Sequence, residues 1–214
     1  MKVLNITNGE YFNRYFISKF GGEAVPFNED FMDGRTVTNI YSEKFISLRA
    51  NELNVSVAEY RSNMQAYDAL KTKEYDRLRL WFGKDTFCQM NLLALLAYLE
   101  QIRFSGRILL NYIDDETFAL IDADIEVELG PYRTLYEQIL IFKRCPNSLG
   151  VLVRSAIDLY FDYLSPNGSL ANLVKANGHM DKTALVCLLI ESAAAYGLSD
   201  LQAERLIRAH SVNG

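Results

Sequence analysis

The chain has 214 residues and half of them are hydrophobic, so it can bury a core and is not a disordered protein. Its formal net charge is −5. Residues 1–130 carry 14 basic and 20 acidic side chains, and residues 131–214 carry 8 and 7. Neither part has the basic excess typical of a protein that holds nucleic acid through phosphate contacts.

The first 70 residues predict alternating strands and helices. Aromatic side chains between residues 11 and 16 recur at helical spacing, and Gly21-Gly22 ends that helix. Ser56 is a suitable N-cap, with Glu59 three positions later. The elements expected here are strand 2–7, helix 10–20, strand 23–27, an acidic loop over 28–34, and amphipathic helices 39–53 and 57–70.

The stretch from Tyr75 to Leu99 predicts a strand, a tight turn and a long helix. Apolar and other residues alternate over 77–82, which indicates a strand. Gly83-Lys84-Asp85 forms the turn, and Asp85 is a good N-cap for a helix with only a narrow polar stripe. A further strand over 107–113 completes a β-α-β unit, which implies two parallel strands.

The run LWFGKDTFCQ at 80–89, followed by NLL at 91–93, resembles the signature of a bacterial domain family of unknown function. That signature reads Trp-Phe, two variable residues, Asp, three residues, Gln and a leucine-rich helix. Asn8-Gly9-Glu10 is similar to the family's opening, which usually has Asp in place of Glu10; many members have His or Asp at the position of Lys84. The resemblance covers about residues 1–125. It implies the fold and carries no established activity.

The second half of the chain predicts one more strand and then helices only. Alternation over 118–129 indicates a half-exposed strand at a sheet edge. Gly130-Pro131 is the clearest boundary, which divides an α/β domain at 1–130 from a helical domain at 131–214. The helices expected after it are 132–144, 149–164, 169–177, 181–196 and 199–210.

These elements predict an α/β fold: a three-layer, mostly parallel, Rossmann-like sheet followed by a mostly helical C-terminal region. Ligands of such sheets bind outside the carboxyl ends of the strands, where helix N-termini favour anions. We therefore expect a phosphorylated or nucleotide-like small ligand there, with Lys84 adding a positive charge. The ligand-binding candidates are Asn8, Gly9, Glu10, Glu29, Asp30, Lys84, Asp85 and Gln89.

Two other interpretations of these residues stay open. Asn-Gly and Gly-Lys-Asp could be turn and cap residues only. Glu10 and the loop carboxylates Glu29, Asp30 and Asp33 could supply a general base or hold Mg²⁺. The sequence has neither GxGxxG after the first strand nor GxxxxGK[ST], which excludes a dinucleotide fingerprint and a P-loop. It identifies no cofactor and leaves open whether the protein is an enzyme.

Cysteine, histidine and apolar patterns bear on compartment and chemistry. Three separated cysteines without CxxC favour free thiols in a reducing compartment, and we expect a cytoplasmic protein. His179 and His210 do not form a metal site, so no metal is predicted. No signal peptide is evident, and no apolar run reaches transmembrane length.

Residues 185–210 are similar to part of a helix-turn-helix, including the second half of motifs found in arabinose-type regulators. Gly197 lies between two predicted helices, and Ser199 with Gln202 forms a capping box. The second helix carries Asp200 and Glu204 beside its arginines, which counts against DNA binding. A regulator that contacts DNA here, or a non-catalytic interaction protein, are the alternative functions. The apolar stripes of these helices fit either core or a homo-oligomer surface.

Overall fold

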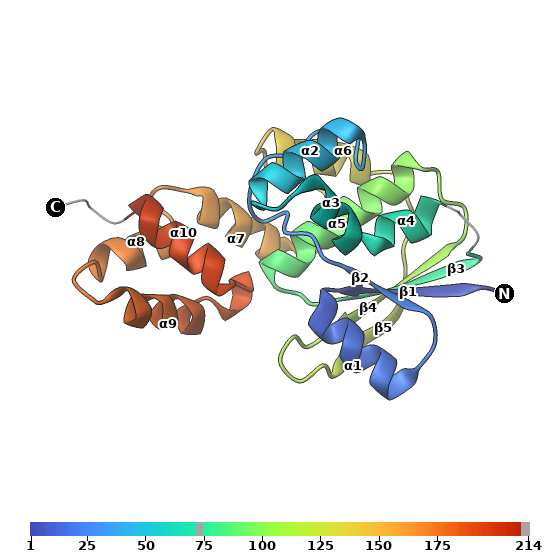
Figure 1. Ribbon diagram of the computed structural model, residues 1–214, viewed down its shortest axis with the longest axis horizontal. Coiled ribbons are helices and arrows are strands. Elements are labelled where there is room, and N and C mark those ends of the chain that lie inside the picture. The colour runs from blue at the N-terminus through green and yellow to red at the C-terminus, as the bar shows by residue number, and fades with distance from the viewer. Residues whose placement is uncertain (72–74, 211–214) are drawn as a thin grey trace.

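The structure, a computed structural model, describes residues 1–71 and 75–210 and is built on one five-stranded sheet (Figure 1). The strands lie in the order β2-β1-β3-β4-β5. β1, β2, β3 and β4 are parallel, and β5 runs antiparallel to β4. The predicted α/β class with a mostly parallel sheet is confirmed. The strand bounds are β1 Val3–Asn8, β2 Ala24–Phe27, β3 Arg77–Phe82, β4 Arg107–Ile113 and β5 Leu120–Glu126.

Helices cover the two faces of the sheet unequally. Figure 1 shows α1 (Glu10–Phe20) on one face and α5 (Thr86–Gln101) on the other, together with α2 (Glu43–Glu52). Every residue of α5 from Cys88 to Leu99 is buried, which explains its almost continuous apolar sequence. The β4–β5 connection is too short for a crossover helix, so α1 covers only part of its face.

The connection between β2 and β3 holds three short helices. After α2 come α3 (Val57–Asn63) and α4 (Gln65–Lys71), so the single helix predicted over 57–70 is interrupted at Met64. Met64 leaves the helical region with ψ 46°. The predicted caps are present: Ser56 accepts from the Glu59 N–H, and Asp85 accepts from the Cys88 N–H at 2.9 Å.

The acidic loop between β2 and α2 is held by a buried ion pair. Arg49 on α2 and Glu29 are both fully buried at the side chain, and Arg49 Nη2 lies 3.0 Å from Glu29 Oε2. Arg49 also donates to the carbonyls of Asp30, Asp33 and Arg35. One cationic side chain therefore fixes the course of residues 29–35.

The remaining helices begin on the α/β part and continue away from it. α6 (Tyr132–Tyr136) and the π-helical turn η1 (Glu137–Ile141) follow β5, and α6 packs against α5. The Glu100 carboxylate on α5 accepts from the N–H groups of Tyr132 and Arg133, at 2.8 Å each. The later elements are α7 Arg154–Leu164, α8 Ser169–Ala176, α9 Lys182–Ser192, η2 Ala194–Tyr196 and α10 Asp200–His210.

Three of these helices are shorter than the sequence predicts. The helix expected over 181–196 ends at Ser192 and is followed by the separate turn η2. The helix expected over 132–144 ends at Ile141, and Lys143 takes a left-handed φ of 51°. The helix expected from residue 149 begins only at Arg154, after a turn closed by the Leu152 N–H to the Leu149 carbonyl. Within the described ranges, none of the helices has the length and hydropathy needed to cross a membrane.

Candidate functional site

The carboxyl ends of β1, β3 and β4 open onto one cavity, because parallel neighbours end at the same edge. Its volume is about 300 Å³. Asn8 and Gly9 come from the β1–α1 turn, Asp85 from the β3–α5 turn and Asp115 from the loop after β4. The lining is completed by Glu10, Tyr11, Phe12, Phe87, Cys88, Ile113, Phe118 and Gly197.

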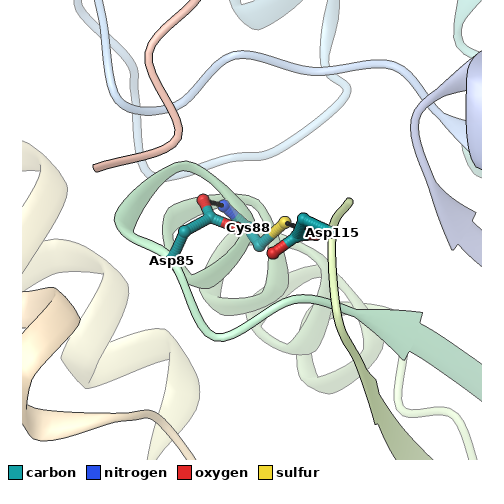
Figure 2. A group of neighbouring side chains, drawn as sticks. All are labelled: Asp85, Cys88 and Asp115. Atoms are coloured by element: carbon teal, nitrogen blue, oxygen red, sulfur yellow. Dashed lines mark hydrogen bonds between the residues drawn. The ribbon is translucent and has the colours of Figure 1, made fainter. Parts of the chain in front are cut away.

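Asp85, Cys88 and Asp115 form the polar centre of this cavity (Figure 2). One oxygen of each carboxylate and the Cys88 sulfur lie within 4.8 Å of one another. The N-cap role of Asp85 fixes its carboxylate over the first turn of α5, where Cys88 also lies. Two glycines leave room for the carboxylates: a Cβ at Gly83 would overlap Asp115, and one at Gly197 would overlap Asp85.

The closeness of these groups changes their ionisation. Partial burial of the Asp115 carboxyl, together with the hydrogen bond and charge of Asp85, raises the pKa of Asp115 to about 8. At neutral pH Asp115 is thus mostly protonated, which lowers the negative charge of the pair. Burial, and then the two carboxylates, raise the pKa of the Cys88 thiol well above its ordinary value. Cys88 is therefore a neutral thiol, unlike an activated cysteine nucleophile.

Asparagine side chains connect the site to its surroundings. Asn8 Nδ2 donates to Cys88 Sγ at 2.9 Å, and the thiol in turn lies 3.4 Å from Asp115 Oδ1. Buried Asn91 donates to Asn8 Oδ1 at 3.0 Å and to the Glu29 carbonyl at 2.6 Å, and accepts from the Phe31 N–H. Asn91 therefore fixes the loops that follow β1 and β2 with respect to each other.

The structure brings four of the predicted ligand-binding residues to this cavity: Asn8, Gly9, Glu10 and Asp85. Lys84 lines an adjacent cavity of about 280 Å³, where its Nζ lies 2.6 Å from Asp122 Oδ2. Gln89 is buried and supports the turn, since it donates to the Gly83 carbonyl at 2.7 Å and accepts from the Val153 N–H.

The predicted residues Glu29 and Asp30 do not line the cavity. The Glu29 carboxylate forms an ion pair with Arg49 and accepts a hydrogen bond from the Tyr60 hydroxyl. Asp30 accepts from Gln202 Nε2 at 3.1 Å, and burial, with the neighbouring charge of Asp33, raises its pKa to about 6. These contacts hold the acidic loop in place.

The alternative in which Glu10 joins the acidic loop in a Mg²⁺ or general-base site is not favoured by these contacts. Glu10 pairs with Arg14 at 2.8 Å, whereas Asp33 accepts from the Tyr163 hydroxyl at 2.7 Å and pairs with Arg205. Each of these carboxylates has its own partner, so they do not converge on one point.

Sequence analysis missed Cys88, Asn91, Asp115 and Gly197. Asp115 is the second residue after β4, so the rule that selected the other strand-end residues could have found it. Cys88 and Asn91 lie in the first two turns of α5, where their spacing from Asp85 places them near the same edge. No local signal marks Gly197, because it reaches Asp85 only through the packing of the C-terminal helices.

The segment similar to a helix-turn-helix packs on the α/β part. Gly197, in the left-handed conformation with φ 67°, separates η2 from α10. On α10, Gln202 contacts Asp30, and Arg205 Nη1 lies 2.8 Å from Asp33 Oδ2. Arg208 is exposed. DNA binding through residues 185–210 stays a prediction, and Arg205 is already engaged within the protein.

No family model matches the chain, and comparison with curated proteins and with solved structures gives no match. The resemblance of residues 80–93 to the signature of a bacterial domain family therefore stays a prediction. No activity, substrate or ligand can be taken from a relative, so function is inferred from the cavity and its chemistry.

Proposed function

We propose that the protein binds a small phosphorylated or nucleotide-like ligand in the cavity at the carboxyl ends of β1, β3 and β4. One observation carries this proposal: the N-terminus of α1, which no side chain caps, and the Asp85–Asp115 pair line the same cavity. The helix N-terminus is suited to an anionic group, and the carboxylate pair is suited to hydroxyl or amino groups. Together they match a ligand that has a phosphate at one end and hydroxyl or amino groups at the other.

The phosphate end of the ligand would lie at α1. Gly9 has φ 85° and provides no side chain, so the backbone at the helix start is accessible. The first N–H groups of an uncapped helix lack intrahelical acceptors and attract anions. Glu10 lies in this turn, but its ion pair with Arg14 offsets its charge.

The hydroxyl end would lie at the carboxylates. An acidic side chain that accepts from sugar hydroxyls is a recurrent partner of nucleotides at this edge of α/β sheets. Because Asp115 is mostly protonated at neutral pH, the pair repels a phosphorylated ligand less than two full charges would. Tyr11 is 79% exposed and its ring centroid lies 5.4 Å from that of Phe118, so an apolar or aromatic group of the ligand can contact these rings.

Isothermal titration calorimetry against nucleoside monophosphates, sugar phosphates, unphosphorylated nucleosides and inorganic phosphate tests this proposal. We expect at least one phosphorylated compound to bind with a dissociation constant below about 1 mM. In Asp115→Asn and Tyr11→Ala the dissociation constant should rise about tenfold, which corresponds to roughly 1.4 kcal/mol.

Glu116→Gln is the matched control, because Glu116 is exposed in the same loop and does not line the cavity. It should bind as the parent does. If the panel contains no binder, or if Asp115→Asn and Tyr11→Ala bind with unchanged affinity, the proposed site is wrong.

A further inference from the structure

A second concave site lies on the α1 face of the sheet, where the C-terminal half of α1 meets β1 and β3. Its volume of about 430 Å³ is within the range of roughly 300–1,000 Å³ of small-molecule sites. The β4–β5 connection, residues 114–119, contains no helix that could pack beside α1. The lining side chains used below are Phe16, Phe20, Arg77, Arg79 and Trp81.

Arg77 differs in its partners from the two other arginines on this face. Its two neighbours on this face are paired: Arg79 lies 3.2 Å from Asp124 and Arg107 lies 2.8 Å from Glu126. For Arg77, by contrast, no hydrogen-bond partner reaches the buried Nε from anywhere in residues 1–71 or 75–210. A buried donor without an acceptor is destabilising and uncommon in folded proteins, so this one calls for a reason.

Aromatic rings form the apolar wall of the groove beside Arg77. The rings of Phe20 and Trp81 are nearly parallel, at an interplanar angle of 18° and a centroid distance of 6.5 Å. The rings of Phe16 and Trp81 are also in contact, with centroids 5.1 Å apart. The Trp81 indole N–H donates to Asn5 Oδ1 at 3.1 Å, which fixes the orientation of the indole. Phe20 is 59% exposed, and Lys19 Nζ lies 5.6 Å from its ring centroid.

We infer that this groove binds a small aromatic anion, with the planar ring against Phe20 and Trp81 and the anionic group at Arg77. Because Arg77 lines the groove, a carboxylate or phosphate there can accept from the outer nitrogens of its guanidinium. This site is separate from the strand-end cavity, and the two share no lining residue. Success or failure of one proposal therefore does not decide the other.

Trp81 makes the test direct, because it is the only tryptophan in the sequence and lies in the groove. Its emission, excited at 295 nm, is followed during titration with benzoate, phenyl phosphate, inorganic phosphate and benzyl alcohol. We expect a saturable change with benzoate or phenyl phosphate and a much weaker response to the two compounds that lack either the ring or the charge. The stronger of the two aromatic anions identifies the preferred anionic group.

Arg77→Gln and Phe20→Ala should each weaken this binding about tenfold. Arg107→Gln is the matched control, since Arg107 lies on the neighbouring strand and outside the groove. Arg77→Gln removes the unpartnered nitrogen, so its thermal midpoint should equal or exceed that of the parent. The inference is overturned if neither aromatic anion gives a saturable response, or if Arg77→Gln and Phe20→Ala respond as the parent does.

Discussion

At the scale of single residues, the fold brings ionisable side chains close together and changes their pKa values, as at Asp115 and Cys88. Asp115 lies against Asp85 because Gly83 and Gly197 have no side chains to separate them. Its pKa is about 8 in the folded protein, against an ordinary value of 3.8. The folded state therefore binds a proton that the unfolded state has released, and stability must fall as the pH rises between these values.

Asp115→Asn removes this titration. The variant should gain stability relative to the parent as the pH rises from about 4 to about 8, and the gain should level off above pH 8. We expect a gain of roughly 1 kcal/mol, well below the full shift, because Asp115 is exposed as a residue although its carboxyl is partly buried, and water screens it. For a chain of this size the thermal midpoint would rise by about 2–4 °C. Thermal unfolding across pH measures this.

Glu116→Gln provides the comparison for this pH series, since Glu116 is an exposed acidic residue of the same loop and does not line the cavity. It should not reproduce the rise in stability that is expected for Asp115→Asn. If the difference in stability between Asp115→Asn and the parent stays constant across the whole pH range, the pKa of Asp115 is not raised.

At the scale of elements, α10 is held against the acidic loop by side-chain contacts. Its polar face meets the acidic loop through Gln202 and Arg205, and Leu206 and Ile207 are buried beside them. The same docking brings Gly197 against Asp85. The position of α10 is thus coupled to the wall of the strand-end cavity.

Arg205→Met should loosen this docking. The ion pair with Asp33 is partly exposed, so its loss should cost about 1 kcal/mol and raise amide hydrogen exchange along α10. Arg208→Met changes an exposed arginine on the same helix and should leave the exchange unchanged. Equal exchange in both variants would mean that Arg205 does not hold α10 in place.

Elements with strong local signals were predictable from the sequence. The strand at 77–82 alternates cleanly, and Asp85 and Ser56 mark helix starts that the structure confirms. The interruption at Met64 was not predictable, because the helical pattern continues through it. In the site, the strand-end rule found Asn8, Gly9, Glu10 and Asp85. It also selected Glu29, which instead pairs with Arg49 on α2. The rule considers only the ends of strands and therefore cannot predict a partner on a later helix.

At the scale of the whole molecule, the buried Arg49–Glu29 pair ties the sheet to the helices that cover it. Arg49 lies on α2, Glu29 follows β2, and Tyr60 on α3 donates to the same carboxylate. All three side chains are buried. Removing one partner would leave an uncompensated charge in the core.

Arg49→Met should therefore lower the free energy of unfolding by about 3–5 kcal/mol in urea denaturation. The control is Arg61→Met, whose pair with Glu43 lies at the surface with side-chain exposures of 37% and 84%. That substitution should lower the free energy of unfolding far less than Arg49→Met does, because water screens an exposed pair. Similar losses in the two variants would contradict a special role for the buried pair.

The contact between Gly197 and Asp85 has a consequence for biosynthesis. Asp85 begins α5, whereas Gly197 belongs to the turn before α10 and is translated much later. A nascent chain can form the sheet and α5 while this side of the cavity still has no wall. The wall of the cavity at Gly197 can form only after residues around 197 have been synthesised.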